Sequence, residues 1–83
     1  MLDPSLYRAL SDKGYDKRKG AALEVEVKVR EAAGVDDVTK LHHIISQLCE
    51  LAASVHSNAR SGGIMGLAAA SLVLSLESRR TSH

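Results

Sequence analysis

The chain has 83 residues and a mass of 8.9 kDa, which allows one small domain or part of a larger one. Its 11 Lys and Arg against 10 Asp and Glu leave a net charge of +1, too small to steer the chain toward nucleic acid or an anionic membrane. Hydrophobic residues make up 45%, which argues against disorder. The 2% aromatic content lacks the stacking platforms of single-strand nucleic-acid readers.

The cysteine count and the N-terminus limit the cellular context. Cys49 is the only cysteine, so neither an internal disulfide nor a multi-thiolate zinc site is expected. The sequence from Met1 to Pro4 has no basic segment followed by an apolar one and predicts no signal peptide. We therefore expect a cytoplasmic protein.

The first predicted helix runs from Pro4 to Lys13. Asp3 is a suitable N-cap, Pro4 suits the first helical position, and Gly14 is a stop signal. The apolar stripe of this helix consists of Leu6, Tyr7 and Leu10.

The second predicted helix, from Asp16 to Ala33, competes with a strand. Residues 24–30 alternate between charged and β-branched side chains, as strands do. However, Glu24 to Lys28 and Glu26 to Arg30 are i,i+4 pairs in the favourable helical order, and no other segment offers this strand a partner. Helix is therefore favoured. Its main apolar face consists of Ala21, Ala22, Val25, Val29, Ala32 and Ala33, and a second face consists of Leu23 and Val27.

The third predicted helix is the clearest amphipathic segment. Gly34 is expected to close the preceding helix and Asp36 to cap this one. Its apolar residues recur at alternating spacings of three and four. They are Val38, Leu41, Ile45, Leu48, Ala52 and Val55, with Ile44 and Leu51 beside them.

The fourth predicted helix runs from about Asn58 to Glu77. The segment from Ser61 to Leu76 is uncharged over 16 residues, or roughly 24 Å of helix, which is short of the ~30 Å of a bilayer core. We therefore expect a buried helix and not a membrane span. Residues 78–83 are polar and lack an apolar period, which predicts a disordered tail.

The sequence repeats itself with a shift of about 42 residues, which lies within the period of the helix pairs in HEAT and armadillo repeats. This repeat shift aligns the second helix with the fourth and the first with the third. It matches Asp16 with Asn58, Arg18 with Arg60, Gly20 with Gly62, Ala22 with Ile64, Leu23 with Met65, Val25 with Leu67, Leu6 with Leu48 and Leu10 with Ala52. The predicted fold is all-α, with HEAT/armadillo-like helical hairpin repeats at about residues 4–33 and 36–77, as two repeats of a truncated α-solenoid.

Four sequence blocks resemble one family more specifically. They are Arg8–Lys13, Tyr15–Lys19, Ala21–Glu26 and Arg60–Ala70. They are similar to the vacuolar scaffold family Vac-fourteen, the HEAT-repeat subunit of the PIKfyve (Fab-type) phosphoinositide kinase complex. The resemblance covers about residues 6–76 and is expected to fall in the N-terminal repeats of the family.

This resemblance implies a non-enzymatic scaffold that supports phosphatidylinositol 3,5-bisphosphate synthesis. It implies a PIKfyve-type lipid kinase as partner and a peripheral location on endosomal, lysosomal or vacuolar membranes, reached through the complex. A Sac-domain phosphatase binds the C-terminal repeats of the family, which these residues do not match. No nucleic-acid partner is implied.

The residues themselves suggest one candidate contact site. Lys17, Arg18, Lys19 and Arg60 could meet an acidic partner or lipid phosphates, although a basic run of this kind is commonly a solvated helix start. The close spacing of Gly62 and Gly66 is explained by helix packing within a soluble repeat.

No residue pattern predicts catalysis, a cofactor or a metal site. His42, His43 and His56 lack the spacing of metal ligands, and Cys49 has no basic neighbour on its helix face. No phosphate-binding loop or nucleophile with a base is recognisable, so we expect no enzyme. Two alternatives to the scaffold remain: a small helical adaptor that self-associates through its apolar last helix, or a non-functional truncated product.

Overall fold

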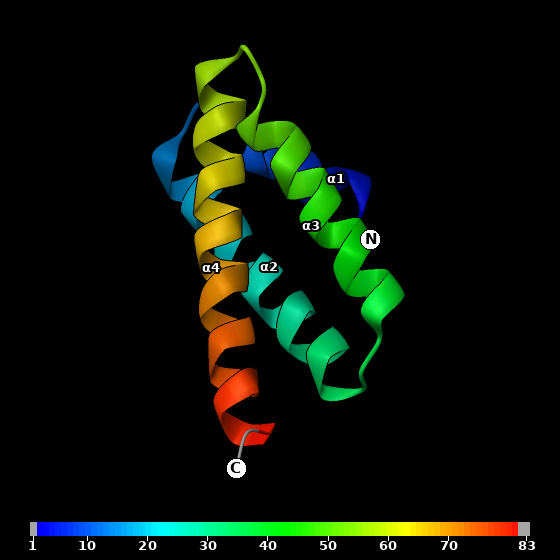
Figure 1. The fold of residues 1–83 in the computed structure, drawn as a ribbon. Coiled ribbons are helices and arrows are strands. Elements are labelled where there is room, and N and C mark those ends of the chain that lie inside the picture. The colour runs from blue at the N-terminus through cyan, green and yellow to red at the C-terminus, as the bar shows by residue number, and fades with distance from the viewer. Residues whose placement is uncertain (1, 82–83) are drawn as a thin grey trace.

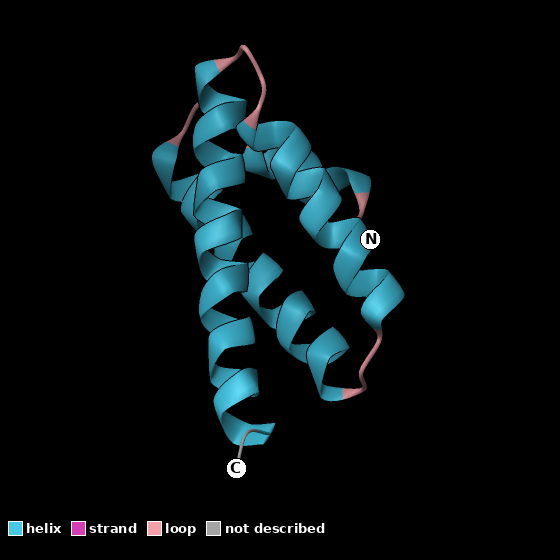
Figure 2. Ribbon diagram, in the orientation of Figure 1, coloured by secondary structure: helices cyan, strands magenta, loops and turns pink. Residues whose placement is uncertain are grey.

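The computed structural model describes residues 2–81, with side chains described as far as residue 77. It contains α1 (Pro4–Leu10), α2 (Tyr15–Gly34), α3 (Val38–Ala52) and α4 (Ser57–Thr81) (Figure 1). No strand occurs within residues 2–81 (Figure 2). The all-α fold of helical hairpins predicted from the sequence is confirmed.

The four helices form two consecutive pairs that pack on each other. In Figure 1, α4 runs the length of the molecule beside α2 and meets α3 near the loop that joins them, while α1 crosses the start of α2. The most deeply buried large side chains are at most 2% exposed and come from all four helices. They are Leu10, Val25, Val29, Ile44, Leu48 and Val73. At about 1.5–3 kcal/mol for each buried aliphatic side chain, this shared core holds the two pairs together.

Glycines on α4 allow the two pairs to approach closely. A Cβ on Gly62 would collide with the backbone of Leu10 at the end of α1, and one on Gly63 would collide with the α3 backbone near Ala52. A Cβ on Gly66 would collide with the Leu48 side chain, so the close spacing of Gly62 and Gly66 serves helix packing within the chain, as the sequence predicts.

α2 is a helix throughout, so the alternating segment 24–30 does not form a strand. The predicted main face is buried at Ala21, Ala22, Val25, Val29 and Ala32, and Ala33 is half-buried. Arg30 Nη2 lies 3.1 Å from Glu26 Oε1, as the i,i+4 pattern indicates. The second face, Leu23 and Val27, is exposed.

Helix ends account for several differences from the sequence prediction. α1 ends at Leu10 and not at Lys13, because Ser11 and Asp12 turn back to donate hydrogen bonds to the carbonyls of Arg8 and Ala9. The predicted cap at Asp36 is wrong. Asp36 has a left-handed φ of 55°, and its neighbour Asp37 accepts the capping hydrogen bond from Lys40 N at 3.0 Å.

The turn around Asp36 ends α2 with a backbone motif whose left-handed position is normally occupied by glycine. Asp36 N donates to Ala33 O at 3.2 Å, and Asp37 N donates to Ala32 O at 2.9 Å. These two bonds form a Schellman motif with Asp36 at its left-handed position. Gly34, the predicted stop, is the last helical residue and needs no special φ.

The buried stripe of α3 is displaced from the predicted one. Ile44, Leu48 and Leu51 are buried, whereas Leu41, Ile45 and Ala52 are half-buried. Val38 is exposed on the first turn, and Val55 is exposed in the loop, because α3 ends at Ala52. The spacing predicts the helix correctly, but the line of side chains that is buried lies next to the predicted one.

α4 extends further than the sequence suggests. It continues to Thr81, so the predicted disordered tail is wrong for residues 78–81, and residues 82–83 lie outside the described part. From Ser57 to Glu77 the helix is long and apolar enough to cross a membrane, so the length argument against a span does not hold for the whole helix. Core helices of soluble proteins meet the same criterion. One face of α4 is buried here, including Ala59, Ala70 and Val73.

Candidate interaction surface

The two loops that join the helices within each pair, residues 11–14 and 53–56, share a hydrogen-bond pattern. The Asp12 carboxylate accepts from Gly14 N at 2.7 Å, and at the matched position of the second loop the Ser54 hydroxyl accepts from His56 N at 3.1 Å. The repeat shift also carries the end of α1 onto the end of α3 and the start of α2 onto the start of α4. The shift found in the sequence therefore describes equivalent local structures.

Arg18, the first of the matched arginines, ties the α1–α2 loop to α4. Its Nη1 donates to Asp12 O at 2.8 Å and lies 3.5 Å from Asn58 Oδ1. The guanidinium also lies over the Tyr15 ring, 5.9 Å from the centroid. Its Nε is buried without a hydrogen-bond partner. Arg18 is thus half-buried and engaged within the fold.

Arg60 repeats the loop contact of Arg18 in the second pair but remains exposed. Its Nη1 donates to Ser54 O at 3.3 Å and lies 3.5 Å from Val55 O. The carbonyls of Asp12 and Ser54 each lie six residues before their arginine. Arg60 leaves its outer side open to solvent.

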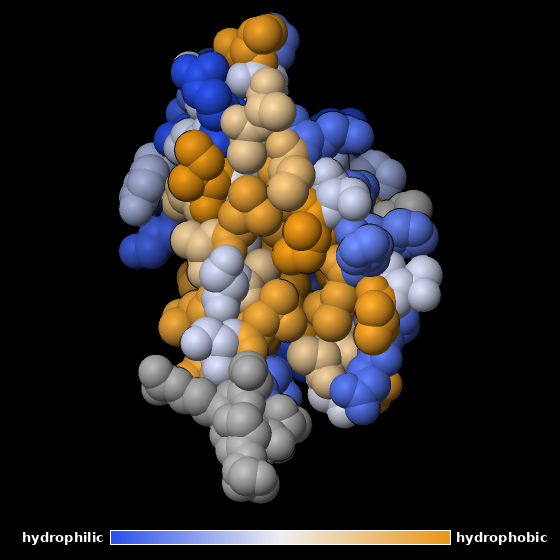
Figure 3. All heavy atoms as spheres, in the orientation of Figure 1, coloured by the Kyte–Doolittle hydropathy of each residue, from blue (hydrophilic) through white to orange (hydrophobic). Residues whose placement is uncertain are grey.

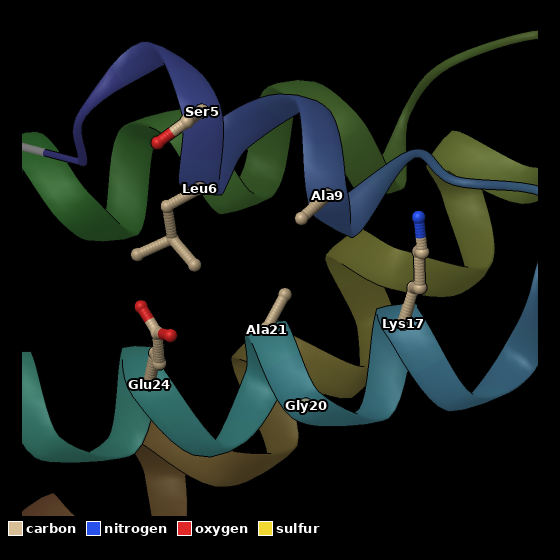
Figure 4. A pocket seen from close by; sticks show the side chains of 7 residues that line it. All are labelled: Ser5, Leu6, Ala9, Lys17, Gly20, Ala21 and Glu24. Carbon is tan, nitrogen blue, oxygen red and sulfur yellow. The ribbon is translucent and has the colours of Figure 1, made fainter.

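The predicted basic site divides into two kinds of residue. Lys17 and Lys19 are exposed at the start of α2 and leave their ammonium groups available. Lys17 borders a surface groove of about 390 Å³ between α1 and α2, where Figure 4 shows it beside Ala9 and Ala21. Arg18 and Arg60 are instead occupied, in part, with loop carbonyls.

A second groove, of about 520 Å³, lies between α1 and α3 and was not anticipated from the sequence. At its edge the Tyr7 hydroxyl donates to Glu50 Oε1 at 2.9 Å. This hydrogen bond, with smaller contributions from burial and from the Glu50 charge, raises the pKa of Tyr7 above its ordinary value of 10.0. Helical spacing alone could not pair two residues that lie on different helices and so far apart in the sequence.

The free faces at the two ends of the stack differ in polarity. The repeat shift matches the buried face of α4 with a face of α2 that carries four charged side chains. This α2 face consists of Lys17, Gly20, Ala21, Glu24, Lys28 and Glu31, of which Ala21 is buried in the core and the others are exposed or half-buried. The outward face of α4 has no charge between Ser61 and Leu76, and Figure 3 shows apolar and small side chains gathered along it. One end is therefore polar and the other apolar.

Comparisons with known proteins find relatives of one kind. The chain is 44% identical over 77 residues to "Protein VAC14 homolog" of Arabidopsis thaliana, an alignment covering 92% of this chain and 10% of that protein. It is 40% identical over 77 residues to "Vacuole morphology and inheritance protein 14" of Saccharomyces cerevisiae, covering 90% and 9% respectively. The chain is related to a segment of the VAC14 proteins.

A third relative supports the same relationship. "Protein VAC14 homolog" of Schizosaccharomyces pombe is 38% identical over 76 residues, covering 88% of this chain and 9% of that protein. No family model and no solved structure matches the chain. The resemblance predicted from the four sequence blocks is confirmed, and the chain spans about a tenth of the length of these VAC14 relatives.

The side chains predicted to have no metal or redox role are exposed at the surface. His42, His43 and Cys49 are exposed on α3, and His56 is exposed in the following loop. Among the described residues, no group of three His, Cys, Asp or Glu side chains could hold a metal ion. The surface features that distinguish this VAC14-related chain are the charged face of α2 at one end and the apolar face of α4 at the other.

Proposed function

We propose that the chain is a non-enzymatic scaffold element, formed by two HEAT-like helix pairs at about residues 4–33 and 36–77. The repeated Arg18 and Arg60 contacts support this proposal most directly, because the same hydrogen bond to a loop carbonyl recurs at matched positions of the two pairs. Repeats of this kind present helix surfaces to partners and stack on their neighbours.

The unlike ends fit the first position in such a stack. Terminal repeats of solenoids carry a polar outer face, which keeps them soluble, whereas interior repeats bury apolar faces on both sides. The charged face of α2 suits the terminal position, and the uncharged face of α4 suits contact with a further helix. This supports placement in the N-terminal repeats of the family.

By its relationship to VAC14, the scaffold would act with a PIKfyve-type lipid kinase and support phosphatidylinositol 3,5-bisphosphate synthesis. It would reach endolysosomal or vacuolar membranes through that complex. The name of the yeast relative, which refers to vacuole morphology and inheritance, supports a vacuolar role. Within the chain, the exposed Lys17 and Lys19 are the proposed partner contacts, because their charges are not used by the fold.

A segment exchange in yeast tests this function. The segment of the yeast relative that matches this chain is replaced by the chain itself, and vacuole size and kinase co-purification are measured. We expect both to stay near the wild-type level. Enlarged vacuoles and loss of the kinase, from a chimera expressed at normal abundance, would contradict the proposal.

A charge reversal at the proposed contact gives the second readout. Within that chimera, Lys17→Glu with Lys19→Glu is expected to lower kinase recovery at least threefold. Lys13→Glu, which reverses an exposed charge in the loop before α2, serves as the matched control and should have little effect. Equal kinase recovery from both variants would show that Lys17 and Lys19 are not part of the contact.

A further inference from the structure

The groove between α1 and α2 contains a glycine that no contact within the described residues explains. Gly20 lies in the interior of α2, where glycine is less favourable than alanine. A Cβ on Gly20 would meet no atom within 4 Å, so packing inside the chain does not require a glycine there. Gly20 lines the groove beside Ala21, and Ala9 of α1 lies opposite (Figure 4). The groove therefore leaves room for a backbone from another molecule.

The second helix pair shows which element covers a glycine at this position. The repeat shift matches Gly20 with Gly62, and a Cβ on Gly62 would collide with the carbonyl group of Leu10. Leu10 is the last residue of α1, and the last turn of α1 carries the basic side chain of Arg8. In this fold, the matched glycine thus receives the C-terminal end of a helix that has a basic last turn.

We propose that the α1–α2 groove binds the C-terminal end of a helix from a partner protein, with a basic side chain in its last turn. The groove carries opposite charges at its two ends, where Lys17 and Glu24 lie in Figure 4. At the rise of an α-helix these two residues are about 10 Å apart along α2, which is close to the diameter of a helix, about 10–12 Å. One helix end therefore fits between them.

Both charged side chains find complementary groups on such a helix end. The last carbonyls of a helix have no partners within the helix and carry a partial negative charge. Lys17 is exposed and can donate hydrogen bonds to these carbonyls, and the exposed Glu24 can pair with a basic side chain of the last turn. A helix with an acidic last turn would instead place like charges at Glu24. The inference rests on the proposed function, in which Lys17 contacts the kinase, and it specifies the chemistry of the bound segment.

Filling the groove in the yeast chimera tests the inference within the complex. Gly20→Leu adds a side chain in open space, so the melting temperature of the isolated chain should not fall, whereas kinase recovery should fall at least fivefold. Gly34→Leu is the matched control, because a Cβ on this last residue of α2 also meets nothing within 4 Å, and it should leave recovery unchanged. Equal recovery from the two variants would overturn the groove contact. Kinase recovery by the unsubstituted chimera tests the scaffold function separately.

Two peptides test the chemistry of the bound segment on the full chain alone. Both are alanine-rich helices of about 18 residues with amidated C-termini, and a single arginine lies in the last turn of one and in the first turn of the other. At millimolar concentration, only the last-turn peptide should shift the backbone amide signals of residues 17–24. Glu24→Gln should weaken this binding at least threefold, whereas Glu31→Gln, at an exposed position outside the groove, should not. No shifts with the last-turn peptide, or equal shifts with both peptides, would overturn the proposal.

Discussion

At the residue scale, two matched glycines have opposite surroundings. Gly62 lies against the Leu10 backbone, whereas a Cβ on its counterpart in the first pair, Gly20, would meet nothing within 4 Å. Gly62→Ala should therefore destabilise the fold by about 2–3 kcal/mol through overpacking. Gly20→Ala should stabilise it by about 0.5–1 kcal/mol through helix propensity. Thermal unfolding of both variants makes the comparison, and a Gly62→Ala protein as stable as wild type would contradict the close approach of α4 to α1.

Asp36 is the one non-glycine residue with positive φ among the described residues. Glycine adopts this conformation without the cost that a Cβ imposes, roughly 1–2 kcal/mol. We expect Asp36→Gly to raise the unfolding free energy by about 0.5–1 kcal/mol, an increase in Tm of several degrees for a domain of this size. Asp37→Ala, which removes the true cap, should lower it by about 1 kcal/mol. The opposite ranking would show that Asp36, and not Asp37, is the N-cap of α3.

Tyr7 provides a pH-dependent contribution. Because the fold raises its pKa, the Glu50 contact stabilises the protein below about pH 10 and is lost as pH rises through the higher folded-state value. In Tyr15→Phe, Tyr7 is the only phenol, so its absorbance change reports one titration. We expect a midpoint above 10, which Glu50→Ala should lower. An unchanged midpoint in Glu50→Ala would exclude the hydrogen bond as the cause.

At the element scale, equivalent arginines differ in their contacts. Arg18 joins its loop and approaches Asn58 on α4, whereas the exposed Arg60 contacts only its own loop. Arg18→Ala should cost about 1.5–2 kcal/mol and Arg60→Ala about 0.5 kcal/mol or less, because the hydrogen bonds to a half-buried cation are better protected from water. Urea unfolding measures both. Equal costs would show that Arg18 does not connect the two pairs.

Sequence patterns predict these elements well where periodicity is strong, and poorly where neighbouring side chains could fill the same capping role. The repeat shift anticipates the matching loops, and i,i+4 charges identify α2 as a helix despite its alternation. Asp36 is the predicted N-cap of α3 and Asp37 the observed one. Either carboxylate could serve by sequence, and the backbone hydrogen bonds of the turn decide between them. Of the proposed contact residues, composition could not distinguish the engaged Arg18 from the available Lys17, because loop carbonyls carry no sequence signal.

At the scale of the whole molecule, the two pairs form one unit because α4 packs on both α2 and α3. The first pair has a seven-residue helix, α1, that could not fold alone, and the Leu10 backbone at its end lies against Gly62 of the second pair. The polar and apolar ends then determine how this unit meets other helices. The two pairs are therefore expected to fold cooperatively, as one unit.

Circular dichroism of the full chain during heating tests this claim most directly. We expect a helical spectrum and one cooperative transition, which Gly62→Ala shifts as a whole to lower temperature. Two separate transitions, or a gradual loss of helix without a midpoint, would show that the pairs do not form a single folded unit.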